Sequence, residues 1–116
     1  IRENIATLGA GEVCEVITAD VFRRFNEPPA AGERPWLVFC CPPYDFFIDR
    51  RDAALSLIRT FLQAAPARSA IVVESDDRFD HSDLPCPGDW DTRRYPPAVV
   101  GIYWKPDPIP PTEPVS

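Results

Sequence analysis

An uninterrupted apolar run spans residues 36–41 and reads Trp-Leu-Val-Phe-Cys-Cys. A run without polar alternation is typical of a β-strand that is buried on both faces, as in a parallel sheet. Pro42 and Pro43 follow, and because neither can donate a ladder hydrogen bond, the strand should end there. The pattern predicts a central strand with Tyr44 presented beyond its carboxyl end, where open α/β sheets bind ligands.

The next segment has the spacing of an amphipathic helix. The apolar stripe of this helix consists of Ala54, Ile58, Phe61 and Ala65. Asp49 suits the N-cap of the helix, and Pro66 should end it. Residues 69–74 then read as a second apolar strand, and a helical crossover between two strands makes them parallel.

The first residues of the chain carry weaker signals. Residues 1–8 place apolar side chains at helical spacing and are followed by Gly9, a residue type common at helix ends. Residues 12–18 alternate apolar and polar positions, and the acidic residues among them favour an edge strand. Asp20 then suits the N-cap of a short helix over residues 21–25.

The last part of the chain indicates an antiparallel hairpin. Residues 90–95 and 98–105 are two strand-like segments joined by a pair of prolines. Residues 106–116 are rich in proline and almost without apolar mass, which predicts an extended or disordered tail. We therefore expect an α/β fold with one domain over residues 1–105 and a proline-rich tail after it.

Length and charge narrow the classes of function. A chain of 116 residues holds at most one domain. The net charge of −6 argues against phosphate binding by this chain, unless its arginines cluster. Methionine is absent and the first residue lies inside an apparent helix, so we expect the chain to be a piece of a longer protein. No apolar run is long enough to span a bilayer, and we expect a cytoplasmic protein.

Four cysteines could form two disulfides or bind a metal, but their positions favour neither. Cys14, Cys40 and Cys41 lie in apolar strand patterns, where a free cysteine behaves as a small hydrophobic residue. No Cys-x-x-Cys pair occurs, so a zinc site built from Cys41, His81 and Cys86 has little support and we expect no metal.

The ending Cys41-Pro42-Pro43-Tyr44 resembles the fourth motif of S-adenosylmethionine-dependent methyltransferases that modify exocyclic amino groups. In that family a buried strand ends in Asp/Asn-Pro-Pro-Tyr/Phe. Over residues 1–105, the order of the flanking segments is similar to that of the bacterial 16S ribosomal RNA guanine-N2 methyltransferases. The resemblance implies a Rossmann-like class I methyltransferase, of which this chain would hold the carboxyl-terminal part of the sheet with its terminal antiparallel hairpin.

The resemblance also implies catalytic roles for Cys41, Pro42, Pro43 and Tyr44. The carbonyl of Pro42 would accept a hydrogen bond from the target amine at a corner made rigid by Pro43. The Tyr44 ring would stack on the target base, which contributes about 1–3 kcal/mol. Cys41 stands where the family has Asp or Asn. Because a thiol is a weak acceptor, this change should cost ~1.5–3 kcal/mol, or about one to two decades in rate.

S-adenosylmethionine is the cofactor that the resemblance implies. Asp20 would accept a hydrogen bond from the adenine amino group, and the amide of Val21 would meet the edge of the adenine ring. The alternative is that Asp20 acts only as a helix cap. The family's Gly-rich turn has no counterpart in this sequence. We therefore expect that this chain alone does not bind the cofactor with useful affinity.

The partners implied are ribosomal RNA or a small-subunit assembly intermediate, and no membrane. In the family sheet, two further strands lie between the segments that correspond to residues 12–18 and 36–41. Without them, the edge of an apolar strand is exposed and seeks a partner. We expect this edge to be covered by a missing amino-terminal half of the protein or by self-association.

Several alternatives stay open. Cys41 and the acidic charge are compatible with a catalytically inactive methyltransferase-like module for binding or assembly. DNA adenine and a protein glutamine amide are further candidate targets, because the same motif serves them. His81 could face the same crevice, although a lone exposed histidine usually has no role. Glu74, at the end of the second apolar strand, is interpreted as structural.

Overall fold

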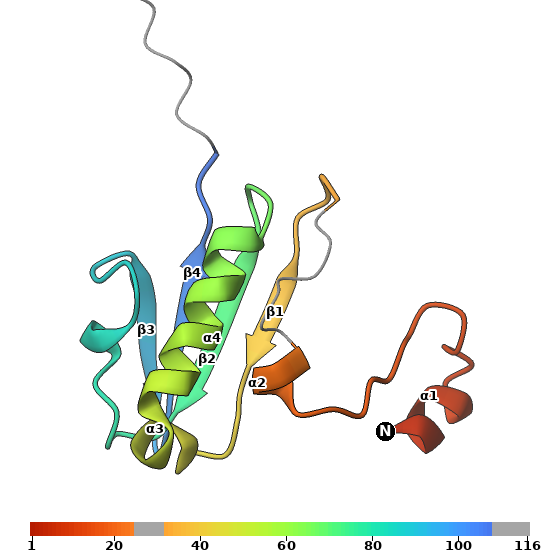
Figure 1. Ribbon diagram of the computed structural model, residues 1–116, viewed down its shortest axis with the longest axis horizontal. Coiled ribbons are helices and arrows are strands. Elements are labelled where there is room, and N and C mark those ends of the chain that lie inside the picture. The colour runs from red at the N-terminus through yellow and green to blue at the C-terminus, as the bar shows by residue number, and fades with distance from the viewer. Residues whose placement is uncertain (25–31, 108–116) are drawn as a thin grey trace, which may run out of the picture.

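Four strands form one mixed sheet in the computed structural model, which describes residues 1–24 and 32–107. The strands are β1 (Leu37–Cys40), β2 (Ala70–Ser75), β3 (Trp90–Tyr95) and β4 (Ala98–Trp104). Their order is β1-β2-β4-β3, with β1 and β2 parallel and β4 antiparallel to both of its neighbours (Figure 1). The α/β class and the hairpin are therefore confirmed, and the final strand inserts between β2 and β3.

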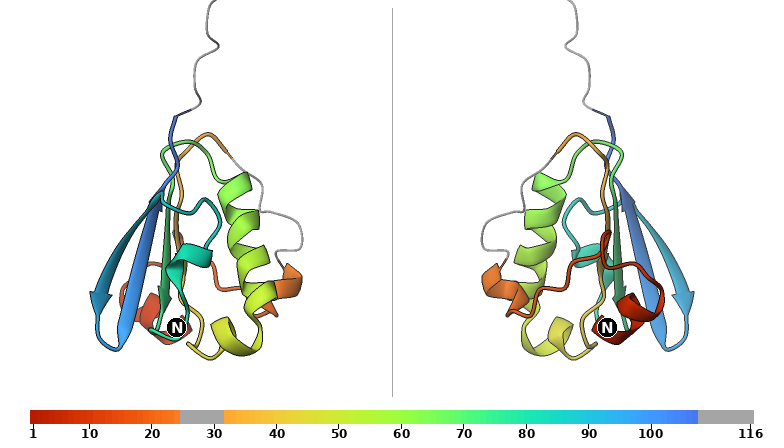
Figure 2. Two further views of the ribbon diagram at one scale, coloured as in Figure 1. Left: turned by 90° about the vertical axis from the view of Figure 1, so that its left-hand side faces the viewer. Right: turned by 90° about the vertical axis from the view of Figure 1, so that its right-hand side faces the viewer.

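One long helix covers one face of this sheet. After the short helix α3 (Phe46–Asp49), α4 (Arg51–Ala64) runs back along the sheet and connects β1 to β2 (Figure 2). Its buried side chains are Ala54, Leu55, Ile58 and Leu62. The helix is therefore amphipathic as predicted, but of the four predicted stripe residues Phe61 is only half-buried and Ala65 is buried just beyond the helix. Because this crossover returns the chain to the end where β1 began, β1 and β2 run parallel.

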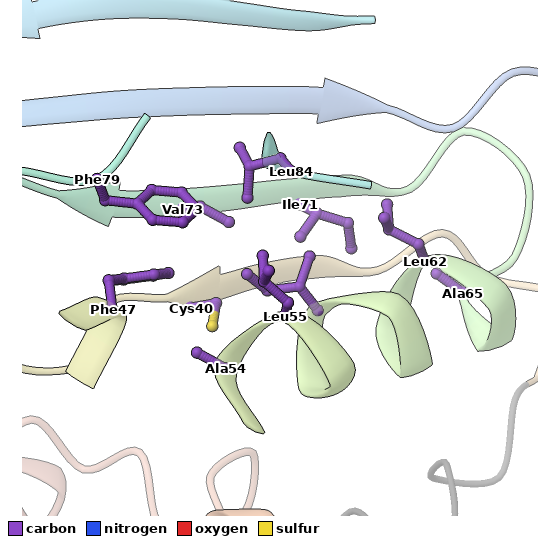
Figure 3. Close-up of a cluster of buried hydrophobic side chains, with 11 residues drawn as sticks. Cys40, Phe47, Ala54, Leu55, Leu62, Ala65, Ile71, Val73, Phe79 and Leu84 are labelled. Atoms are coloured by element: carbon purple, nitrogen blue, oxygen red, sulfur yellow. The ribbon is translucent and has the colours of Figure 1, made fainter. Parts of the chain in front are cut away.

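The hydrophobic core lies between α4 and the sheet. Its fully buried large side chains come from segments far apart in the sequence: Phe47, Ile58, Ile71, Val73 and Leu84 (Figure 3). Burying one such side chain contributes about 1.5–3 kcal/mol, so this layer is the main source of stability. The loop that follows β2, with the 3-10 helix η1 (His81–Asp83), folds back over the sheet and adds Phe79 and Leu84 to the core.

The prediction that residues 36–41 form a strand buried on both faces was wrong in one respect. The strand is present as β1, but it lies at an edge of the sheet, and Leu37 and Phe39 are 64% and 67% exposed. Only the side chains of Val38 and Cys40 face α4, because alternate residues of a strand point to opposite faces. In the described part of the chain, no helix or strand covers the other face of β1.

The predicted strand over residues 12–18 was also wrong. These residues form a turn and then an irregular segment, in which Val13 is 86% exposed. A strand needs a hydrogen-bonded neighbour, and the sheet as described offers none to this segment. The alternating pattern alone therefore did not produce a strand.

The two short helices at the start of the chain agree with the sequence. α1 (Arg2–Thr7) ends before Gly9, which has a positive φ of 65°, and α2 (Val21–Arg24) follows Asp20. The last residue of the predicted second helix lies outside the described residues, as do residues 108–116 of the predicted tail. Among the residues that the structure describes, no helix has both the length and the apolar character needed to cross a membrane.

Candidate functional site

The corner that follows β1 lies next to the end of β2. The parallel register pairs Cys40 with Val73, so Cys41, the first residue after β1, lies beside Glu74, the next-to-last residue of β2. The corner then turns into α3, whose first amides use the carbonyls of Pro43 and Tyr44 at 3.0 and 3.2 Å. Among the described residues, no donor reaches the carbonyl of Pro42. This carbonyl is therefore available to a ligand.

Tyr44 is half-buried at this corner and does not lie in the hydrophobic core. Desolvation raises the pKa of its phenol, and the negative charges of Glu74 and Asp76 and a hydrogen bond to Glu74 raise it further. The phenol therefore stays protonated near neutral pH. Tyr44 thus presents an aromatic side chain beyond the carboxyl end of the parallel pair of β1 and β2.

Arg78 forms ion pairs that connect the corner after β1 to the loop after β2; we call this pair of contacts the Arg78 clamp. The Nη2 atom of Arg78 lies 2.8 Å from Oδ1 of Asp45, and its Nε lies 2.8 Å from Oδ2 of Asp76. The backbone amide of Arg78 also donates to Asp76 at 3.1 Å. These hydrogen bonds raise the pKa of Arg78, which stays positively charged. The sequence offered no signal for this clamp, because Asp45 and Arg78 are 33 residues apart.

An apolar pocket of about 460 Å³ adjoins the same corner. Its walls come from α2, β1 and its corner, and α4: Val21, Phe22, Leu37, Val38, Phe39, Cys40, Cys41, Pro42, Ala54, Leu57 and Phe61. The structure thus brings together Val21, predicted to bind the cofactor, with Cys41 and Pro42, predicted to be catalytic. A flat apolar ligand fits such walls.

Asp20 acts as a helix cap. Its Oδ1 accepts a hydrogen bond from the amide of Phe22 at 3.0 Å, and its backbone carbonyl accepts from the amides of Arg23 and Arg24. Among the described residues, nothing bonds to the second carboxylate oxygen of Asp20. The cap and a hydrogen bond to a ligand are therefore compatible in this one residue.

Two aromatic rings and an arginine hold α2 against the corner. The guanidinium of Arg50 lies 4.2 Å from the centre of the Phe22 ring and 5.8 Å from that of Phe46. The two rings are 6.1 Å apart, and such cation–π contacts contribute about 0.5–1 kcal/mol at exposed sites. The contact fixes one wall of the pocket. No local sequence pattern indicates this contact, because Phe22 and Arg50 lie far apart along the chain.

Cys41 is a neutral thiol in this site. Desolvation raises its pKa, the charge of Glu74 raises it further, and a hydrogen bond from the Glu74 backbone offsets part of the shift. Its neighbour Cys40 is buried, and burial raises the pKa of Cys40 to about 11. Neither thiol is a strong hydrogen-bond acceptor.

His81 does not lie in this crevice and is not exposed. It is only 9% exposed, and its Nε2 lies 2.8 Å from Oγ of Ser75. Because Ser75 donates to the carbonyl of Asp76, its oxygen accepts from Nε2–H, which leaves Nδ1 unprotonated and without a partner. His81 is therefore a packed side chain, and burial followed by the charge of Arg94 lowers its pKa.

Among the described residues, Cys41, His81 and Cys86 form no zinc site. All four cysteines are free, and the described residues contain no group of three or more metal-ligating side chains that could hold an ion.

No protein-family model matches the chain, and no curated protein matches it. A function for this chain therefore has to be argued from the geometry of its own residues.

Proposed function

We propose that this chain is the carboxyl-terminal part of an S-adenosylmethionine-dependent methyltransferase that acts on an exocyclic amino group of a nucleobase, with guanine N2 of 16S ribosomal RNA as the target. One observation carries the proposal. The corner after β1 presents the free carbonyl of Pro42 and the half-buried ring of Tyr44 at the carboxyl end of a parallel strand pair, beside an apolar pocket. The antiparallel insertion of β4 after the parallel strands also supports a class I methyltransferase sheet.

The cofactor would supply an electrophilic methyl group. The residues present fit its adenine end, since Val21 and Phe22 line an apolar pocket and Asp20 has a spare carboxylate oxygen. The chain's own residues would hold the acceptor. Pro42 accepts a hydrogen bond from the amine, and Tyr44 stacks on the base. Positioning supplies most of the acceleration, and no strong base is needed because the nitrogen loses its proton after attack.

The remaining cofactor contacts would come from a partner of β1. β1 pairs only with β2 in the described sheet, and its Leu37 and Phe39 are exposed. An apolar edge strand of this kind is a template for pairing with another strand. We propose that an amino-terminal half of the same protein, or a second copy, covers this edge in the cytoplasm.

Methyl transfer by the complete gene product that contains these residues tests the proposal. The substrate is 16S ribosomal RNA, naked and in small-subunit assembly intermediates, and the product is identified by mass spectrometry of the nucleosides. We expect N2-methylguanosine. Loss of base stacking in Tyr44→Ala should cost about 1–3 kcal/mol, or about a 5- to 150-fold fall in rate. Tyr95→Ala is the matched control, because Tyr95 is exposed on β3.

A second function is favoured by Cys41, which replaces the acceptor of the family motif. In that case the protein is an inactive methyltransferase-like module that binds ribosomal RNA or an assembly intermediate. Binding without methyl incorporation, in both the wild type and Cys41→Asp, would establish this alternative. DNA and protein substrates test the other candidate targets. N6-methyladenine in DNA or a methylated glutamine amide in a protein would show that the methyltransferase acts on that target instead of ribosomal RNA.

Calorimetry on the isolated chain adds an independent measurement. We expect S-adenosylmethionine to show no micromolar binding, because no Gly-rich turn is present in these residues. Micromolar binding would contradict the expectation that a further segment completes the site.

A further inference from the structure

The target amine of the proposed reaction has two N–H groups, and this chain shows an acceptor for only one of them. Pro42 offers its free carbonyl to the first. The side chain that should accept from the second is a thiol in Cys41, which is a weak acceptor. A polar group left unpaired in a closed site is costly, so another side chain near Cys41 should take over this contact.

Glu74 is the carboxylate in the right place. It follows Val73, the register partner of Cys40, so within β2 it stands beside Cys41, the first residue after β1. Because both residues stand one position beyond the Cys40–Val73 pair, their side chains point to the same face of the sheet, opposite to α4. The charge of Glu74 also raises the pKa of the Cys41 thiol, so the two side chains lie near one another. The two side chains therefore share one edge and one face at the corner.

The Glu74 carboxylate has spare acceptor capacity. It is half-buried, and among the described residues no arginine or lysine forms an ion pair with it. Its charge raises the pKa of the Tyr44 phenol, which is also the proposed stacking platform. An ionised carboxylate offers about four acceptor sites, so one bond to a phenol leaves room for an amine.

We infer that Glu74 supplies the second hydrogen-bond acceptor for the target amino group, in the role that Cys41 cannot fill. This inference rests on the proposed function. Pro42 and Glu74 would hold the two N–H groups, so that the lone pair of the nitrogen points out of the base plane. The lone pair forms the new N–C bond while the sulfonium sulfur keeps the electrons of the broken C–S bond. The nitrogen then releases one proton, and the Glu74 carboxylate is a base placed to receive it.

The test measures turnover and base preference in the complete gene product. Turnover is methyl incorporation into 16S ribosomal RNA. Base preference is the ratio of affinities for short single-stranded RNAs that carry one guanosine or one inosine, measured with S-adenosylhomocysteine present. Inosine lacks the exocyclic amino group, so this ratio reports the amine contact without any chemical step.

Three variants define the contact. Glu74→Met removes the acceptor at similar size and should lower kcat about 10- to 100-fold and the guanosine preference about 10-fold or more. Glu74→Gln keeps a carbonyl oxygen and should retain most of the guanosine preference. Cys41→Asp in the Glu74→Met background should restore both quantities, since an acceptor returns on the neighbouring strand. The matched control is Asp77→Asn, an exposed carboxylate that lines a different pocket.

A structural role for Glu74 gives a different result. If Glu74 served only to hold Tyr44, Tyr44→Phe and Glu74→Met would lower kcat alike, the guanosine preference would not change in Glu74→Met, and Cys41→Asp would restore nothing. That outcome would overturn the inference while leaving the proposed function intact. Failure of the proposed function is visible in the wild type, which would then neither methylate the RNA nor prefer guanosine to inosine.

Discussion

Gly101 of β4 is the position where a single added methyl group should disturb a buried contact. A Cβ atom built at Gly101 would lie 2.8 Å from Nδ1 of His81, and 3.3 Å from both Cε1 of His81 and Cε3 of Trp90. Ordinary contact begins at 3.4 Å, so the His81 ring must withdraw by about 0.6 Å. That ring is buried and is held by Ser75 at 2.8 Å, so it has little room to move.

The expected cost of Gly101→Ala follows from these contacts. Overpacking a filled core costs about 1–3 kcal/mol, and a strained hydrogen bond to Ser75 adds up to about 1 kcal/mol. Replacing a glycine inside a strand returns about 0.5–1 kcal/mol. We therefore expect the free energy of unfolding to fall by about 1–3 kcal/mol, a large part of a typical domain's stability.

Urea unfolding followed by circular dichroism measures this change. Gly11→Ala is the matched control, because a Cβ atom at Gly11 meets nothing within 4 Å, and its stability should stay close to that of the wild type. Gly101→Ala should cost much less in a His81→Ala background, because the clashing ring is then absent. The same cost in both backgrounds, or a cost no greater than that of Gly11→Ala, would refute this account of the contact.

Three further changes have expected outcomes. Burial, and then the charge of Arg94, lowers the pKa of His81 below 6.5. The unfolded chain therefore binds more protons, and unfolding free energy should fall as pH drops from about 7.5 to about 5.5, less steeply in His81→Ala. Arg78→Met removes both ion pairs of the corner, so the free energy of unfolding should fall in low salt and fall less in 1 M NaCl. A loss that does not depend on salt would contradict an electrostatic origin. Cys40, buried with a pKa of about 11, should resist iodoacetamide at about pH 8 until urea unfolds the chain, as peptide mass spectrometry would show.

The elements that the sequence predicted well are those specified by nearby residues. The stripe of α4 repeats with helical spacing, and Pro66 follows its end, so its existence and its end follow from local chemistry. The predicted N-cap was wrong, because Asp49 belongs to α3 and Arg50 stands at the N-cap of α4 without a side-chain hydrogen bond. β2 and the β3–β4 hairpin are likewise apolar or alternating segments between prolines and polar loops. The candidate corner, Cys41 to Tyr44, was also found in the sequence, because two adjacent prolines must end a strand.

The predictions that were wrong depend on which other segments lie next to a residue in the fold, and a local sequence pattern does not contain this information. Residues 12–18 alternate like a strand, but a strand forms only when a neighbour supplies hydrogen bonds. The run of residues 36–41 does form β1, yet it does not reveal which of its faces another element covers. Leu37 and Phe39 are exposed because α4 packs on the opposite face of the sheet.

The sequence by itself therefore determined where the long helix, the strands and the diproline corner lie along the chain, since helical spacing, apolar runs and prolines act over a few residues. Only the tertiary structure placed Glu74 beside Cys41, closed the Arg78 clamp over Asp45, and buried His81 against Gly101. Each of these contacts joins residues of separate segments. Their partners are set by strand register and by packing in space, which depend on the whole folded chain.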